Sequence, residues 1–96
     1  MATKKTKKIE SPLRIGNAVY VCMVTYHVVG RVVLLTAGDV VLDDASWIGD
    51  PGARMYNVLK DGKLEECEPF PDPVLLGRGA IVDATTWRHA LPREQK

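Results

Sequence analysis

The chain has 96 residues, enough for one domain with a single hydrophobic core and too few for two. A hydrophobic fraction of 46% and a charged fraction of 26% are typical of a globular protein and exclude an intrinsically disordered one. No apolar run reaches the roughly 18 residues that span a bilayer, and the basic start lacks the apolar core of a secretion signal. We therefore expect a cytoplasmic protein that does not bind membranes, with both cysteines, Cys22 and Cys67, reduced.

The formal net charge of +1 hides a concentration of basic side chains near the start of the chain. Residues 1–12 have no apolar periodicity and end in Ser-Pro, which predicts a flexible basic arm. A single β-rich domain is expected at 13–92, followed by a short tail at 93–96. The lysines of the arm either contact nucleic-acid phosphates or simply keep the arm solvated. They are Lys4, Lys5, Lys7 and Lys8.

Strands dominate the first half of the domain. Residues 18–42 are dense in valine and other β-branched or aromatic residues, which predicts a valine-rich antiparallel β-hairpin. We expect Gly30 to mark a bend or bulge, and Gly38 to form the turn before a strand at 40–42. Successive side chains of a strand point to opposite faces of the sheet, and along the first strand both sets are apolar. Both faces of the sheet therefore need a cover.

The second half alternates turns with short elements. Gly-Asp-Pro-Gly at 49–52 predicts an exposed loop, and apolar residues at helical spacing predict a short helix at 53–60. The acidic segment 65–72 contains prolines that exclude a central strand, so it is expected to cross the surface. A bent closing strand is predicted at 74–82.

Asp83 is placed to cap a last helix, which would carry Trp87 and Leu91. Together the elements predict an α+β fold: an antiparallel curved sheet of four or five strands, or a small barrel, with two short helices and a basic N-terminal arm. Helices of about eight residues cover one face of such a sheet at most. Since symmetric assemblies are common, we expect a homo-oligomer to cover the other face, with a monomeric barrel as the alternative.

No sequence motif indicates catalysis. The sequence has no phosphate-binding glycine loop, no nucleophile elbow and no pair of histidines at helical spacing. The two histidines, His27 and His89, fit structural positions better than the role of general base or metal ligand. The aspartates of the turns and strand ends match no calcium loop. We therefore expect a non-enzymatic protein with no cofactor and no metal ion.

A binding site is the remaining functional expectation. Trp47 follows a strand and precedes the Gly-Asp-Pro-Gly loop, where a tryptophan either lines a ligand pocket or anchors the core. Arg54, Tyr56 and Arg78 lie in or beside glycine-rich segments, where guanidinium and backbone N–H groups can hold an anion. These four residues are the predicted site for a ligand or a partner protein.

Two stretches, VTYHVVGRVV at 24–33 and VLDDASWIG at 41–49, carry a family resemblance. Together with Gly62 and the closing strand before Trp87, they resemble a family of small phage and prophage proteins of unknown function, over residues 24–91. The resemblance implies a protein of a mobile genetic element. Small phage proteins of this kind are usually virion components or accessory proteins that bind a host molecule.

Three functions follow as hypotheses. The first is a homo-oligomeric accessory protein in the host cytoplasm, which binds or sequesters a host protein or a small anionic ligand. The second is a structural or decoration protein of the virion. The third is nucleic-acid binding through the basic arm.

Overall fold

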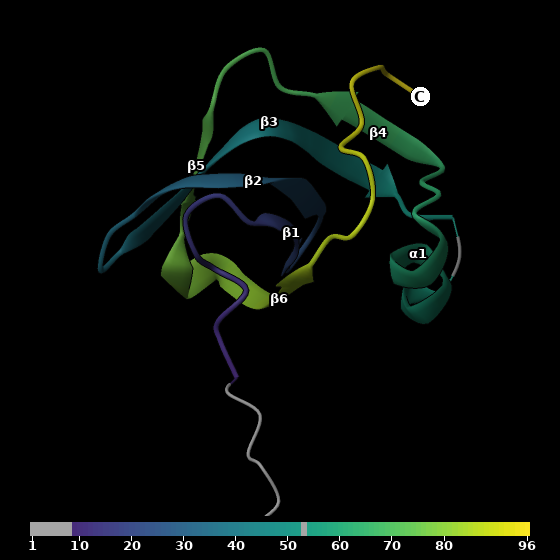
Figure 1. Ribbon diagram of the computed structural model, residues 1–96. Coiled ribbons are helices and arrows are strands. Elements are labelled where there is room, and N and C mark those ends of the chain that lie inside the picture. The colour runs from purple at the N-terminus through teal and green to yellow at the C-terminus, as the bar shows by residue number, and fades with distance from the viewer. Residues whose placement is uncertain (1–8, 53) are drawn as a thin grey trace, which may run out of the picture.

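The structure is a computed structural model that describes residues 9–52 and 54–96 (Figure 1). The four lysines of the predicted arm lie outside the described residues. In the described part of the chain, six antiparallel strands form one sheet, accompanied by one short α-helix. In chain order the elements are β1 (Ala18–Met23), β2 (His27–Leu35), β3 (Asp39–Asp50), α1 (Met55–Asp61), β4 (Glu66–Pro69), β5 (Val74–Gly77), the single-turn 3-10 helix η1 (Arg78–Ala80) and β6 (Ile81–Thr86).

The predicted hairpin at 18–42 is a meander of three strands, β1, β2 and β3. A tight turn joins β1 to β2, because the Met23 N–H donates to the Tyr26 carbonyl at 2.9 Å. A second turn joins β2 to β3, where the Asp39 N–H donates to the Thr36 hydroxyl at 2.9 Å. The high density of β-branched side chains explains why these segments are extended.

The remaining strands are added at both edges of the meander. β3 is long enough to pair with β5 along Asp39–Leu42 and with β4 along Ser46–Asp50. At the other edge β6 pairs with β1, so the order across the sheet is β4-β3-β2-β1-β6. Since η1 alone connects β5 at one edge to β6 at the other, the sheet is strongly curved (Figure 1).

Gly30 lies inside β2, where the neighbouring strand approaches closely. A Cβ atom at this position would lie 2.9 Å from the Cβ of Ala45 and 3.1 Å from the Cβ of Leu42. The pairing of β2 with β3 shifts at this point, which is the bulge that the sequence predicts here. Gly30 is therefore required by the close contact between the two strands.

The sheet buries both faces, and each face has its own core. The inner face, around which the sheet curves, carries Val21 and Val28; the outer face carries Tyr20 and Val29. The inner core is made of Val19, Val21, Val28, Val32, Val40, Leu42, Ala45 and Leu76. The outer core is made of Tyr20, Val29, Ile48, Val58, Leu64, Cys67, Trp87 and Leu91.

The outer core is covered by α1 together with the segment that follows β6. Trp87 stacks on Tyr20 with ring centroids 5.7 Å apart. His89 packs over Gly62, the left-handed residue that ends α1, and its Nε2 donates to the Leu59 carbonyl at 2.7 Å. This part of the outer face is thus removed from water within one chain.

Three parts of the predicted fold are wrong. In the described part of the chain the sheet has six strands and is not closed, so it is not a barrel, and the fold is mostly β with a single α-helix. The predicted helix after Asp83 does not form, because β6 continues to Thr86 and Asp83 pairs with Cys22 of β1. The β-branched Thr85 and Thr86 favour this strand. By contrast, α1 confirms the short helix predicted at 53–60, although it begins at Met55 and ends at Asp61.

The segment 93–96, predicted as a tail, lies against β4. The Lys96 N–H donates to the Cys67 carbonyl at 2.8 Å, and its Nζ donates to the Leu64 carbonyl at 3.1 Å. None of the helices in the described residues is long and apolar enough to cross a membrane.

Gly30→Ala should destabilise the protein by about 1–3 kcal/mol, because the added methyl overpacks against Ala45 and neither strand can move away without losing its pairing. Urea denaturation followed by circular dichroism measures the effect. Gly77→Ala is the matched control, since a Cβ there meets nothing within 4 Å. Equal stability of the two variants would contradict the close contact.

Val58→Ala should cost about 2 kcal/mol, because Val58 is the buried residue through which α1 packs on the outer core. Val24→Ala is the control, since Val24 is exposed in the turn between β1 and β2, and it should change stability by less than about 0.5 kcal/mol. If both substitutions have the same small effect, α1 does not cover this face.

Candidate functional site

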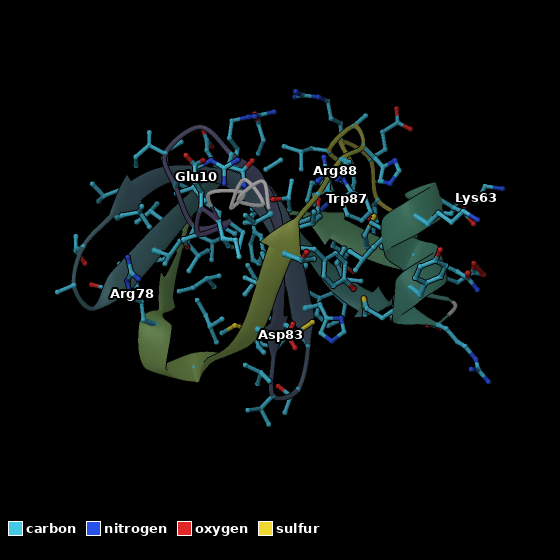
Figure 2. All side chains as sticks on the ribbon, turned by 60° about the horizontal axis from the view of Figure 1, so that its bottom comes forward. Glu10, Lys63, Arg78, Asp83, Trp87 and Arg88 are labelled. Atoms are coloured by element: carbon cyan, nitrogen blue, oxygen red, sulfur yellow. The ribbon has the colours of Figure 1, made fainter. Side chains whose placement is uncertain are left out.

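The four residues of the predicted site lie in different parts of the molecule. Arg54 directly precedes α1 and Tyr56 is inside it, 73% exposed, with the Lys60 Nζ 5.9 Å from its ring centroid. Arg78 belongs to η1, and its Nε donates to the Thr36 carbonyl at 2.9 Å. Figure 2 shows Arg78 and Lys63, which follows α1, at opposite ends of the molecule.

Trp47 is separated from Arg54 and Tyr56 by the sheet, and Arg78 lies near the other end of β3. Trp47 is paired with Val28 and Glu68, and so its side chain lies on the inner face. Its neighbour Ile48 points to the outer face, where it packs with Val58 of α1. The structure therefore brings none of the predicted arginines to Trp47.

Trp47 lines a shallow cleft of about 480 Å³ where the inner face meets the edge of the sheet. The other walls come from β4 and from the residues directly after it. We call this surface the Trp47 cleft; its lining residues are Trp47, Glu68, Pro69, Phe70 and Pro71.

The position of the Trp47 ring is set by its neighbours. Tyr26 packs beside it with ring centroids 6.4 Å apart. Along β3 the ring extends over Gly49, since a Cβ at that glycine would be 2.6 Å from the Trp47 Cζ3 atom. Gly49 leaves room for the indole, and Phe70 is held by its N–H, which donates to the Ala45 carbonyl at 2.8 Å. The cleft thus contains the rings of Trp47 on β3 and Phe70 directly after β4, and Tyr26 of the β1–β2 turn packs beside the indole.

Two glutamates of β4 lie beside Trp47. Glu68 is the pairing partner of Trp47 on β4. The Glu66 Oε1 atom and the edge of the indole both lie within 2.7 Å of the position that a Cβ atom of Gly49 would occupy. Both glutamates are exposed, and no ion pair to either is found among residues 9–52 and 54–96. The cleft is therefore aromatic and acidic, which suits a cationic ligand.

The sequence predicted Trp47 as a site residue but did not predict the two glutamates, Glu66 and Glu68, that make its surroundings acidic. The signal for the glutamates is their alternation around Cys67, which places Glu66 and Glu68 on one face if the segment is a strand. Pro69 and Pro71 led instead to a surface crossing. β4 is in fact an edge strand that ends at Pro69, where proline is tolerated.

A second group of polar side chains crosses the outer face. Asp83, Cys22 and His27 are successive partners across β6, β1 and β2, and His27 Nδ1 shares a hydrogen bond of 2.7 Å with the Tyr20 hydroxyl. Burial raises the pKa of the Tyr20 hydroxyl above its usual value, with a smaller contribution from Cys22. His27 therefore occupies a structural position with a satisfied ring nitrogen.

The thiol of Cys22 is poorly suited to act as a nucleophile. Burial raises its pKa to about 12, and the neighbouring Asp83 carboxylate adds to the shift by accepting a hydrogen bond and by its negative charge. Because the thiolate is the reactive form, this thiol is almost entirely inactive near neutral pH. Burial also raises the pKa of Cys67.

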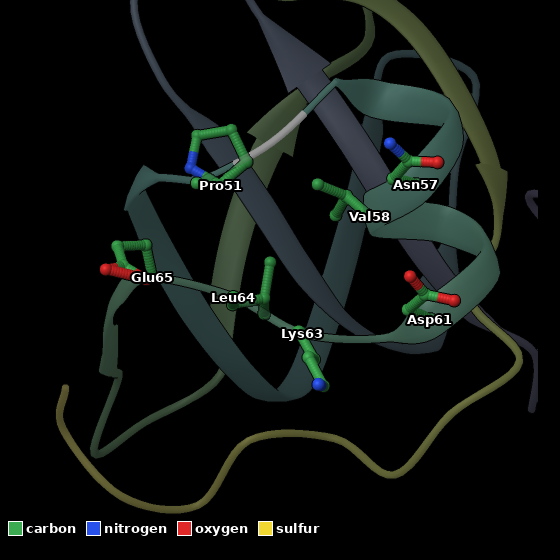
Figure 3. Close-up of a pocket in the computed structure, with 8 residues that line it drawn as sticks. Pro51, Asn57, Val58, Asp61, Lys63, Leu64 and Glu65 are labelled. Carbon is green, nitrogen blue, oxygen red and sulfur yellow. The ribbon is translucent and has the colours of Figure 1, made fainter.

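A small crevice of about 220 Å³ lies between α1 and the segments on either side of it. Figure 3 shows Val58 and Leu64 within the crevice and the carboxylates of Asp61 and Glu65 on opposite sides of it. These charges do not converge on one point. The crevice is a packing feature of α1, and it offers a ligand less aromatic surface than the Trp47 cleft.

Alkylation of Cys22 by iodoacetamide should be slow near neutral pH, and its rate should keep rising beyond about pH 10, where a cysteine of ordinary pKa has almost reached its plateau. Asp83→Asn should lower the pKa of Cys22 and accelerate the reaction, because it removes the negative charge that opposes the thiolate. Peptide mass spectrometry measures the rate at each pH, and Asp72→Asn is the control. A plateau below about pH 10 in the unmodified protein would contradict the raised pKa.

No group of three or more histidine, cysteine, aspartate or glutamate side chains that could hold a metal ion is found in the described part of the chain. Comparison of the sequence with protein-family models and with curated proteins finds no match. The functional argument therefore depends on the geometry of the Trp47 cleft.

Proposed function

We propose that this protein is a non-enzymatic accessory protein of a mobile genetic element that binds a host protein, and that the Trp47 cleft receives a basic, extended segment of that partner. The observation that carries the proposal is the partly buried Trp47 with Glu66 and Glu68 of β4 beside it. The resemblance to small phage proteins supports the setting in a mobile element.

The residue types of the cleft favour a guanidinium or ammonium group. A cation over the face of an indole is attracted by the ring, and the gain is about 0.5–1 kcal/mol at exposed sites and more when water is displaced. A carboxylate beside the ring accepts charge-assisted hydrogen bonds from the same cation. Trp47 with Glu66 and Glu68 supplies both interactions within one surface.

The shape of the cleft favours an extended backbone. Aromatic and proline side chains form a shallow groove, the type of surface that receives proline-rich segments in extended conformation. Such segments lose little conformational entropy on binding. An anionic ligand is a weaker candidate for this cleft, because Arg54 and Arg78 lie elsewhere and the nearest charges are negative.

A fluorescently labelled dodecapeptide of alternating arginine and proline should bind the protein, and an otherwise identical peptide of alternating glutamate and proline should not. Fluorescence anisotropy measures both, and added salt should weaken binding because the charges are exposed. Preference for the acidic peptide, or equal binding of the two, would contradict the proposal.

Trp47→Ala should weaken binding of the arginine–proline peptide at least tenfold, which corresponds to about 1.4 kcal/mol, and Glu68→Gln should weaken it several-fold. Gly49→Val should also weaken binding, since its side chain occupies the place of the indole edge at little cost to the backbone. Tyr56→Ala is the control, because Tyr56 is an exposed aromatic residue on α1 away from the cleft. Unchanged affinity in Trp47→Ala would exclude the cleft as the binding site.

A further inference from the structure

An uncovered apolar surface lies on the outer face at the far end of the β2–β3 hairpin. This end of the hairpin, residues 31–43, projects beyond β1 and is joined by β5 (Figure 1). Leu34 of β2 pairs with Val41 of β3, and Val41 pairs with Leu75 of β5, so the three side chains form one row across three strands. Leu34 is 51% exposed and Leu75 is 59% exposed.

A bulge in β2 enlarges this surface. Val32 pairs with Leu42 on the inner face, whereas Leu34 pairs with Val41 on the outer face, which leaves Val33 as the extra residue of β2. Val33 and Leu34 therefore both turn away from the inner core, and Val33 is 42% exposed. We call the four residues Val33, Leu34, Val41 and Leu75 the hairpin patch.

The hairpin patch is the continuation of the outer core. α1 and residues 87–91 cover the outer core, which includes Val29 and Ile48 at the opposite end of the hairpin. Between the two regions, Arg31 and Asp43 are pairing partners on the outer face, and both are exposed. Scattered apolar residues are normal on a protein surface, but a contiguous row across three strands indicates an interface.

The charges beside the hairpin patch are self-complementary. Arg31 and Asp43 form no ion pair with each other within the described residues, although they are paired across the strands. The Arg31 guanidinium makes one hydrogen bond, from Nη1 to the Gly16 carbonyl at 2.9 Å, which leaves further donors for another acceptor. A two-fold axis that runs along the strands between β2 and β3 would bring Arg31 of each copy opposite Asp43 of the other, and Leu34 opposite Val41.

We propose that the hairpin patch is covered by a second copy of this chain in a symmetric dimer, with Leu34 and Val41 at its centre, Leu75 nearer its edge, and Arg31–Asp43 pairs between copies at its rim. An isologous interface needs a surface that is complementary to itself, and an apolar row flanked by one positive and one negative side chain meets that need. The dimer would leave both Trp47 clefts open, because those lie on the inner face at the other end of β3.

Light scattering after size-exclusion chromatography, repeated over a wide range of protein concentrations, tests this proposal. The unmodified protein should have about twice the mass of the 10.6 kDa chain. Leu34→Lys should raise the dissociation constant at least about tenfold, since a charge would be buried at the centre of the interface, and Leu75→Lys, nearer the edge, should raise it less. Val24→Lys, an equally drastic change at an exposed site outside the patch, should leave the dimer intact.

The rim is tested by reversing its charges. Arg31→Glu and Asp43→Arg should each weaken the dimer, and the double variant should restore it, because the pair between copies is then present in the opposite sense. Circular dichroism verifies that each variant is folded. A 10.6 kDa mass of the unmodified protein at all concentrations would overturn the proposal, as would a dimer that survives both lysine substitutions. Peptide binding by the lysine variants keeps this result separate from that of the Trp47 cleft.

Discussion

The need to remove both faces of one small sheet from water is the constraint on which the rest of the structure depends. Tyr20 and Val21 are consecutive residues of β1 and both are fully buried, although their side chains point to opposite faces. The inner face is buried because the sheet curves until residues from both of its edges share one core. The outer face needs other cover, which α1 and residues 87–91 provide. The two faces are thus buried in different ways.

The extent of the cover on each face determines where apolar surface remains exposed and available for binding. α1 has seven residues and is about 10 Å long, so it covers only part of the outer face and leaves the hairpin patch exposed. On the inner face the core ends near β4, where Trp47 is only partly buried and lines the Trp47 cleft. Both proposed interaction surfaces are places where the cover of an apolar face ends.

The sequence predicted local structure better than pairing. The apolar spacing of Met55, Val58 and Leu59 correctly predicts α1, because a helix is specified by neighbours along the chain. The predicted helix after Asp83 is wrong, since Asp83 resembles a helix cap locally and only its pairing with Cys22 keeps it in a strand. The acidic character of the Trp47 cleft was missed for the same reason. It arises when β4 pairs with β3, and neither strand contains that information alone.

The pairing of β6 with β1 has a consequence for the order of folding. Strands β1, β2 and β3 are joined by short turns and can pair early, because the entropy lost in closing a short loop is small. β6 reaches β1 only after the chain has passed through every other element, so this contact has the greatest separation in sequence and is expected to form late. Until then the backbone of β1 has a free edge that could pair with another molecule. Correct folding of this chain therefore requires that residues 81–86 pair with β1 before a strand of another molecule does.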